Sequence, residues 1–103
     1  MASLKMRQKF EKIQENIITD EEHFHRFIKG DDSSIDPIYR KYYQDLFLYG
    51  QRFGAEEFVD EETIQNLFLN LFKYRSSLKD INNIRSYIFR SFRNLLVRQL
   101  NTD

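Results

Sequence analysis

Apolar residues recur at helical spacing along the chain, and this periodicity constrains the fold more than any other feature of the sequence. The longest unbroken run follows the i, i+3, i+4, i+7, i+8 pattern: Ile64, Leu67, Phe68, Leu71 and Phe72. Such spacing places every apolar side chain on one face of an α-helix. Because no alternating pattern typical of a β-strand occurs, the sequence predicts an all-α protein, a compact bundle of four to five helices.

A short amphipathic helix is expected near the N-terminus, where apolar residues recur at spacings of three and four: Met6, Phe10, Ile13 and Ile17. We therefore expect residues 1–20 to form an N-terminal helical extension and residues 21–103 to form one domain. Further along, Thr19 and Glu22 form a capping-box pattern, which predicts a helix that stops at Gly30.

The remaining boundaries follow from caps and glycines. Asp36 and Pro37 predict the start of a third helix, as its N-cap and first helical residue. That helix is expected to end near Gly54, and a fourth to begin near Asp60. The last helix is expected to run from about residue 82 to residue 100, with its apolar arc turned inward.

Composition limits the classes of protein that the chain can belong to. The 103 residues are 41% hydrophobic and 16% aromatic, which is enough for one core. The absence of cysteine excludes disulfides and thiolate sites. No apolar run is long enough to span a bilayer, and the charged N-terminus lacks the apolar stretch of a signal peptide. We therefore expect a cytoplasmic protein without membrane insertion.

Charge is distributed unevenly, although the formal net charge is zero. Residues 1–72 contain nine Lys or Arg against fourteen Asp or Glu, whereas residues 73–100 contain seven Lys or Arg against Asp80 alone. A basic C-terminal part behind an acidic body suits a polyanionic partner. The same distribution fits an Arg-rich solvated helix face, so charge alone leaves both interpretations open.

The sequence offers little for catalysis or metal binding. His23 and His25 are two residues apart, so on a helix they point in different directions, and we expect surface imidazoles. A single Glu-x-x-His motif occurs, Glu22 to His25, but not the pair of such motifs that a helical di-metal site uses, and no phosphate-cradling glycine loop occurs. We expect no enzyme, no metal site and no cofactor. A metal-dependent helical enzyme would depend on these histidines and nearby acids, and would require a stoichiometric metal in the purified protein.

The polar face of the last helix combines an aromatic ring, an amide and three guanidinium groups. With Ser91 on its boundary, this face consists of Tyr87, Arg90, Arg93, Asn94 and Arg98. Arginines bind phosphates, an amide can read a base edge, and an aromatic ring offers a stacking surface. The alternative is an ordinary solvated face with a half-buried tyrosine, although Asn is a poor residue in the middle of a helix.

The fourth helix carries a second surface of interest, opposite its apolar stripe. This surface contains Glu62, Gln65, Asn66 and, at its edge, Leu69. An amide pair beside an exposed leucine is more typical of a protein-docking surface than of a purely solvating one.

Three segments follow one another in a recognisable order: IKGDDSSIDPIYRKYYQDLFLYG, DEETIQNLFLNLFKYR and NIRSYIFRSFRNLL. Each resembles a successive part of conserved region 2 in bacterial extracytoplasmic-function (ECF) sigma factors of the sigma-70 family. The resemblance covers roughly residues 24–100, and the spacing from Gln65 to Asn94 is similar to that of the family. It implies a transcription initiation domain that docks on RNA polymerase and that recognises and melts the promoter −10 element.

In that family, region 2 docks on the clamp-helix coiled coil of the largest RNA polymerase subunit. The resemblance implies that Glu62, Gln65 and Asn66 contribute to docking, with Leu69 beside them. The family commonly has Asp where Glu62 stands and Glu where Asn66 stands, so this chain departs from the pattern at two positions.

The resemblance also implies a pocket for a flipped base of the non-template strand. Leu78 and Lys79 occupy the loop positions of that pocket, and Ser91 and Asn94 the facing helix positions. Tyr87 stands where the family usually has Trp or another aromatic residue. Four arginines would add attraction to phosphates: Arg75, Arg90, Arg93 and Arg98.

Further partners and alternatives follow from the same comparison. The resemblance implies an anti-sigma factor as an additional partner. It also leads us to expect that the helix-turn-helix domain for the −35 element is absent from this chain, in a shortened form of a longer protein or a natural single-domain relative, and that binding to free DNA is weak. The alternative function is a helical protein-interaction domain without nucleic-acid binding, which an exposed apolar groove in place of the arginine-bearing face would distinguish.

Overall fold

The computed structural model describes residues 5–7 and 18–101. Residues 5–7 are helical, and the apolar positions predicted at residues 10, 13 and 17 lie outside the described residues. From residue 18 onward the elements are α2 (Asp20–Ile28), the 3-10 turn η1 (Asp32–Ser34), α3 (Ile35–Arg52), α4 (Glu57–Lys73), the 3-10 turn η2 (Arg75–Leu78) and α5 (Ile84–Leu100). This described part contains no strand, which confirms the prediction of an all-α bundle.

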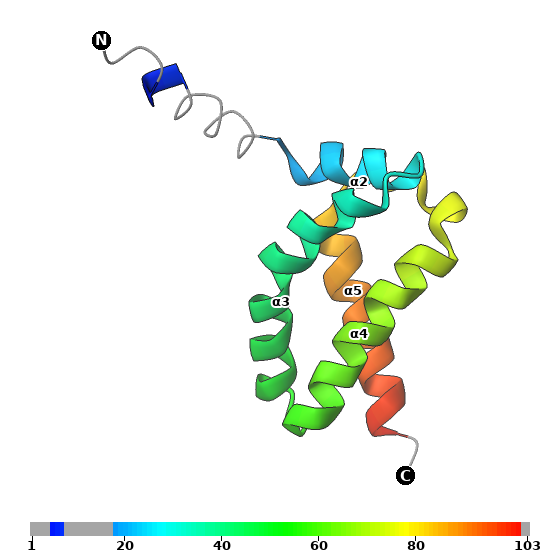
Figure 1. The fold of residues 1–103 in the computed structure, drawn as a ribbon. Helices are drawn as coiled ribbons and strands as arrows, with labels where there is room; N and C mark the ends of the chain where they lie inside the picture. Colours follow the sequence, from blue (N-terminus) through cyan, green and yellow to red (C-terminus); the bar gives the residue numbers. More distant parts are fainter. Residues whose placement is uncertain (1–4, 8–17, 102–103) are drawn as a thin grey trace.

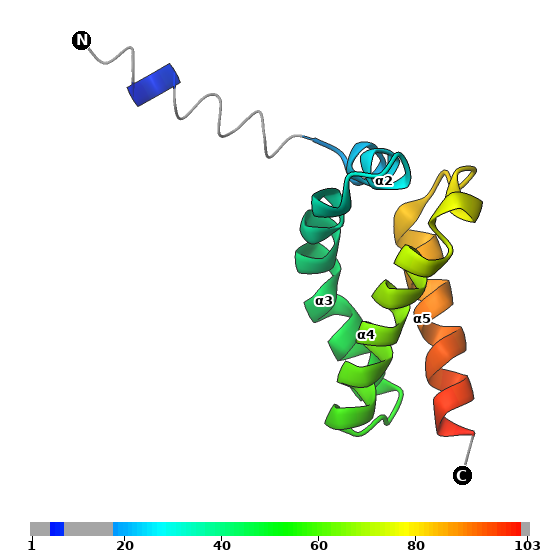
Figure 2. The ribbon, with the colours of Figure 1, turned by 45° about the vertical axis from the view of Figure 1, so that its right-hand side comes forward.

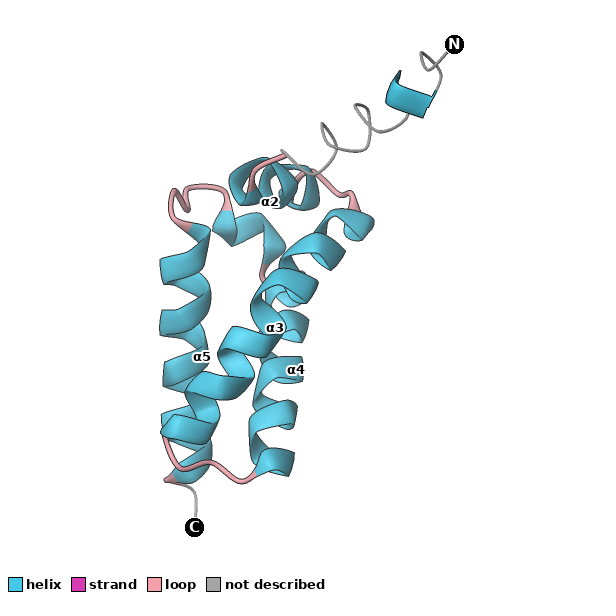
Figure 3. Cartoon of the chain, turned by 90° about the vertical axis from the view of Figure 1, so that its left-hand side faces the viewer, coloured by secondary structure: helices cyan, strands magenta, loops and turns pink. Residues whose placement is uncertain are grey.

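The three long helices α3, α4 and α5 run in alternating directions, and α2 lies across one end of them (Figures 1 and 2). α4 packs against both α3 and α5. The turn η2, which leads from α4 to α5, lies at the same end as α2 and contacts it. Figure 3 shows this end of the bundle, with the connection between α3 and α4 at the opposite end.

The core lies between the four helices, and each contributes side chains at helical spacing. The fully buried apolar residues include Phe27, Ile38, Leu46, Ile64, Leu67, Ile88, Phe92 and Leu96. The stripe predicted for the fourth helix is correct except at Phe72, which is 39% exposed. The Phe72 ring packs edge-on against Phe27, with 5.0 Å between ring centroids, and also lines a surface groove.

α2 begins and ends where the sequence predicts, although only one of the two capping-box hydrogen bonds forms. The Thr19 hydroxyl accepts a hydrogen bond from the backbone amide of Glu22 at 3.1 Å, as an N-cap does. The Glu22 carboxylate, which was expected to reach back to Thr19, accepts a hydrogen bond from Arg26 Nε at 3.3 Å. Gly30 follows the helix with a φ of +113°, a left-handed conformation that glycine adopts without strain.

α3 begins at Ile35, before the predicted Asp36-Pro37 start, because Asp31 organises the preceding turn. The Asp31 carboxylate accepts hydrogen bonds from the Ser33 amide at 3.2 Å, the Ser33 hydroxyl at 2.6 Å and the Ser34 hydroxyl at 2.9 Å. These bonds fix η1, which runs directly into α3. Pro37 therefore lies inside the first turn, where a missing amide hydrogen costs no helical hydrogen bond.

The starts of the last two helices also differ from the predictions. α4 begins at Glu57, about one turn before the predicted start near Asp60. Asp60 lies within the helix and is fully buried, so it is neither a cap nor a solvated first-turn acid. α5 begins at Ile84, two residues later than predicted, because the Asn83 side chain caps it by accepting a hydrogen bond from the Ser86 amide at 3.0 Å.

Asp60 packs directly against Gly50 of α3. A Cβ atom built at Gly50 would lie 2.0 Å from Asp60 Oδ1, so only glycine leaves room for this carboxylate. Gln51 Nε2 donates hydrogen bonds to Asp60 Oδ2 at 3.0 Å and to the Ala55 carbonyl oxygen at 3.3 Å. Asp60 Oδ1 is buried without a hydrogen-bond partner. Burial raises the pKa of Asp60, against a smaller lowering effect of the Gln51 hydrogen bond.

Candidate nucleic-acid interface

A pocket of about 240 Å³ opens between the end of α4 and the polar face of α5. We call it the α5 pocket. Its apolar lining comes from Leu67, Leu71 and Leu95. Its polar and aromatic lining comes from Asn70, Tyr74, Tyr87, Ser91, Asn94 and Arg98. The structure therefore brings four of the predicted DNA-binding residues together, namely Tyr87, Ser91, Asn94 and Arg98.

Asn70 and Tyr74 complete the α5 pocket and were not predicted. Tyr74 follows the last residue of α4, and its backbone amide donates to the Asn70 carbonyl oxygen at 2.9 Å. The chain turns into η2 directly afterwards, which leaves the Tyr74 ring exposed at the pocket. Lys73 Nζ lies 5.4 Å from the centroid of that ring and adds positive charge beside it. The resemblance gave no role to either position, so no sequence signal pointed to them.

The chemistry of the α5 pocket matches a nucleotide better than a purely apolar ligand. Two tyrosine rings offer flat faces, and two amides each present a donor and an acceptor. Arg98 adds a guanidinium group, which can bind a phosphate through two parallel hydrogen bonds. Tyr87 and Ser91 are half-buried, whereas Asn94 and Arg98 are exposed. The pocket can therefore stack a base, contact its edge and hold its phosphate.

Arg90 and Arg93 lie outside the α5 pocket, on the exposed outer face of α5. Within residues 18–101, neither side chain forms an ion pair. Both guanidinium groups thus face solvent beside the pocket, where they can attract phosphates at positions that the pocket does not reach.

Leu78 and Lys79, which were predicted to line the base pocket from the loop, do not line the α5 pocket. Leu78 is buried in the core, and Leu78 and Lys79 line a different pocket of about 350 Å³ together with α2 residues such as Phe24 and Ile28. The physical reason is that η2 folds against α2, which draws its apolar Leu78 side chain into the core. Lys79 remains exposed, and neither residue shares a pocket with Asn94.

Arg75 also differs from its predicted role as a phosphate contact. Its Nη2 atom lies 2.5 Å from Asp32 Oδ1, and its guanidinium lies over the rings of Phe27 and Phe72, at 4.3 and 5.2 Å from their centroids. The charge is thus neutralised by Asp32 and the side chain is largely covered. Arg75 thus links η2 to η1 and α2, and its contact with a phosphate stays a prediction.

The predicted docking residues lie together on the outer face of α4. Glu62, Gln65, Asn66 and Leu69 are all exposed, and Leu69 is 65% exposed. Phe58, which was not predicted to belong to this face, is 74% exposed. Phe58 begins a second stripe of regularly spaced residues along α4, which consists of Phe58, Glu62, Gln65, Leu69 and Phe72. We call this set the α4 stripe; its alternating steps of four and three residues are those of helices that pack in coiled coils.

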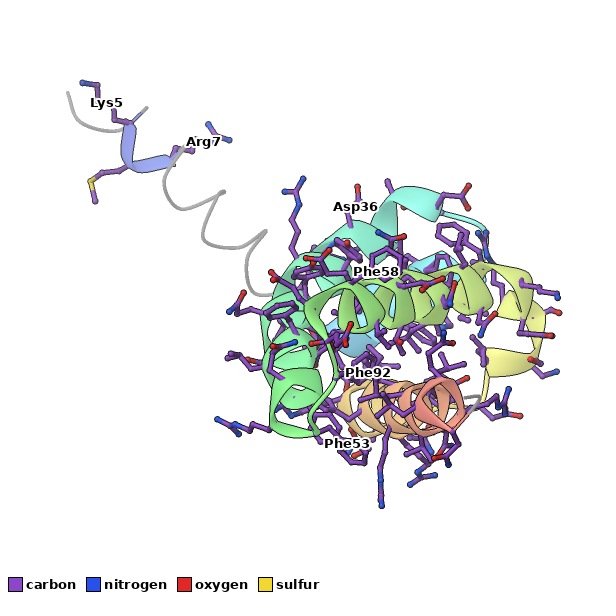
Figure 4. All side chains as sticks on the ribbon, turned by 90° about the horizontal axis from the view of Figure 1, so that it is seen from below. Lys5, Arg7, Asp36, Phe53, Phe58 and Phe92 are labelled. Carbon is purple, nitrogen blue, oxygen red and sulfur yellow. The ribbon has the colours of Figure 1, made fainter. Side chains whose placement is uncertain are left out.

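A predominantly apolar groove of about 490 Å³ adjoins the α4 stripe. This α4 groove is formed by Asp32, Ser33, Ile35, Asp36, Tyr39, Phe68 and Phe72. In Figure 4, Phe58 lies on the side of α4 away from α5, whereas Phe92 lies between the helices. The structure therefore has an exposed apolar groove in addition to the arginine-bearing face of α5, and the two surfaces lie on different sides of α4.

Comparison with protein-family models, with curated proteins and with solved structures found no match. Among the helices of the described ranges, none combines the length and apolar character needed to cross a bilayer.

Proposed function

We propose that this chain is the polymerase-docking and −10-recognition domain of an ECF-type sigma factor. The observation that carries the proposal is the α5 pocket, a space of about 240 Å³ lined by Tyr74, Tyr87 and Asn94. Beside it, Arg90 and Arg93 are exposed and form no ion pair within residues 18–101. The order of the three sequence segments that resemble sigma region 2 supports the same assignment independently. The loop residues Leu78 and Lys79, to which the resemblance gave the other side of the base pocket, line a different pocket, and this counts against the assignment.

The α5 pocket would act as a trap for an unpaired base. Extruding a base from a duplex costs a few kcal/mol, and stacking on an aromatic side chain returns about 1–3 kcal/mol per base. Tyr74 and Tyr87 supply the stacking faces, while Asn70 and Asn94 supply hydrogen bonds to the base edge. Melting then needs no fuel in this domain, because the captured base offsets the cost of opening.

The α4 stripe and the α4 groove supply the docking surface for polymerase. Phe58, Leu69 and Phe72 offer apolar contacts on one side of the helix, with Glu62 and Gln65 between them. Such a face suits packing against another helix, as the clamp-helix coiled coil of RNA polymerase would provide. Because the formal net charge of the chain is zero, affinity for promoter DNA would depend on this second attachment.

The test compares binding of single-stranded −10 sequences in the presence of a clamp-helix fragment. Asn94→Ala should weaken the preference for one base, because it removes an amide from the α5 pocket, while helicity measured by circular dichroism stays unchanged. Asn82→Ala, which removes an exposed amide outside the α5 pocket, is the matched control and should leave the preference intact. An unaltered base preference in Asn94→Ala would exclude Asn94 from base recognition.

A second candidate function is a helical protein-interaction domain without a nucleic-acid role. The observation that favours it is the α4 groove together with the exposed rings of Phe58 and Phe72. This candidate predicts that the chain binds a helical protein partner while single-stranded DNA fails to bind with or without that partner. Binding of DNA that depends on Asn94 would exclude it.

A further inference from the structure

A further pocket opens between α3 and α5, and no predicted site residue lines it. This α3/α5 pocket has a volume of about 320 Å³ and is lined by Asp45, Leu48, Tyr49, Arg52, Arg85 and Phe89. Arg85 and Tyr87 are two residues apart on α5, so they point to opposite sides of the helix. The α3/α5 pocket and the α5 pocket therefore flank the same helix. Pockets for small ligands occupy about 300–1,000 Å³, so this one suits a single small ligand.

Two guanidinium groups stand at the α3/α5 pocket. Arg52 is exposed, and no ion pair of Arg52 exists within residues 18–101. Arg85 lies over the Phe89 ring at 4.8 Å and forms a long ion pair with Asp45, with 3.7 Å between Nη1 and Oδ2. Both partners of that pair are exposed, and such pairs contribute little. An incoming phosphate can thus bind Arg52 directly and displace Asp45 from Arg85 at small cost.

The rest of the pocket wall is apolar and partly open to solvent. Leu48 is exposed, whereas Tyr49 and Phe89 are half-buried. Phe53 lies outside this pocket, is exposed, and stacks on Tyr49 with 6.0 Å between ring centroids. The Tyr49 ring also packs edge-on against Phe89 and Phe92. A wall of one exposed leucine and two half-buried aromatic rings, beside two arginines, matches the two halves of a nucleotide, a flat base and a phosphate.

The outer face of α5 connects the two pockets. Arg90 and Arg93 lie on this face, between the side that carries Tyr87 and the side that carries Arg85, and both are exposed. An α-helix is only about 10 Å across, so a short stretch of single strand can cross it. The exposed arginines would meet the phosphates along that path.

We propose that the α3/α5 pocket binds a nucleotide, with its phosphate on Arg52 and Arg85 and its base against Leu48 and Tyr49. This inference extends the proposed function, because the captured strand would continue from the α5 pocket around α5 to a second nucleotide site. A free mononucleotide has the same chemistry as a unit of the strand, so the two sources are separated by experiment.

The first measurement is the affinity of the full chain, with the clamp-helix fragment, for fluorescent single-stranded DNA at several salt concentrations. Arg52→Ala should weaken binding about two- to fivefold and reduce the salt slope by about 0.7, the loss expected for one phosphate contact on a single strand. Asp45→Asn should act in the opposite direction and tighten binding, up to about fivefold, because it removes the competing carboxylate. Arg40→Ala removes the same charge from α3 outside the pocket and should leave the salt slope unchanged.

The second measurement is a titration of the chain with deoxythymidine monophosphate, followed through the ring signals of Tyr49 and Phe53 by nuclear magnetic resonance. Saturable shifts that Arg52→Ala abolishes would show that a free nucleotide is sufficient. Unmoved signals together with the Arg52 effect on DNA would assign the site to the strand. Either result supports the proposal.

The proposal is overturned if Arg52→Ala behaves like Arg40→Ala and the mononucleotide leaves the Tyr49 and Phe53 signals unmoved. If DNA binding then still depends on Asn94, the proposed function stands and only the second nucleotide site fails. If DNA does not bind the parent chain at all while the mononucleotide does, the proposed function fails and the pocket remains a nucleotide site.

Discussion

Replacing Gly50 by alanine should destabilise the fold strongly, because the added Cβ atom would clash with the side chain of Asp60. The added Cβ would lie 2.0 Å from Asp60 Oδ1, 2.3 Å from Cγ and 2.6 Å from Oδ2, so the whole carboxylate must move. Overpacking of this kind costs about 1–3 kcal/mol. Displacing Asp60 also breaks its hydrogen bond from Gln51, and a bond to a charged group contributes about 1.5–3 kcal/mol.

Helix propensity opposes these costs, because alanine is favoured over glycine inside a helix by about 1 kcal/mol. The net expectation is a loss of about 2–5 kcal/mol in the free energy of unfolding, measured by urea denaturation with circular dichroism. In an Asp60→Ala background the clash is removed, so Gly50→Ala should instead be neutral or stabilise by up to about 1 kcal/mol. The sign of the effect therefore depends on residue 60.

Gly54→Ala is the matched control for this cycle. Gly54 has a φ of +89° and no atom within 4 Å of a built Cβ, so its cost is one of backbone strain alone. That cost should be the same in the parent and in Asp60→Ala. Equal destabilisation by Gly50→Ala in both backgrounds would refute the reasoning, because it would show that the Asp60 carboxylate is not what excludes a side chain at Gly50.

Two further predictions concern pH dependence and docking. Burial raises the pKa of Asp60, so the folded state holds the carboxyl proton more tightly than the unfolded state does. The free energy of unfolding should therefore fall as pH rises from about 4, the ordinary carboxyl pKa, through the raised pKa. Asp60→Ala should remove that fall, which urea midpoints measured across pH would show. Leu69→Ser should change the free energy of unfolding by less than about 0.5 kcal/mol, because the side chain is 65% exposed. It should nevertheless weaken binding to a clamp-helix fragment by about fivefold or more in calorimetric titration. Equal binding by the variant and the parent would show that docking uses another surface.

The sequence predicts the helices where spacing and capping agree. The α4 core face follows from its unbroken apolar stripe, and Thr19 and Gly30 mark the ends of α2 correctly. Prediction from the sequence is wrong where tertiary contacts override a local helix-start signal. Asp60 resembles a helix-start residue, but it is buried because Gly50, ten positions earlier, leaves room for it across the α3–α4 contact.

The candidate site divides in the same way. Tyr87, Asn94 and Arg98 share a face because helical periodicity alone places them there, so the sequence could group them. Tyr74 and Leu78 depend on how the chain leaves α4 and folds against α2, which periodicity does not specify. The sequence alone does not show which arginines form ion pairs. Arg75 is neutralised by Asp32 because η2 packs next to η1, whereas Arg90 and Arg93 face solvent.

We propose that the α5 pocket holds an unstacked base of the non-template strand. The most direct measurement is the fluorescence of 2-aminopurine placed at successive positions of a single-stranded −10 sequence, bound with the clamp-helix fragment. We expect that 2-aminopurine at one position is quenched on binding by stacking on a tyrosine, and that Tyr87→Ala restores its fluorescence while the strand stays bound. Uniform fluorescence at every position, or quenching that Tyr87→Ala leaves unchanged, would contradict it.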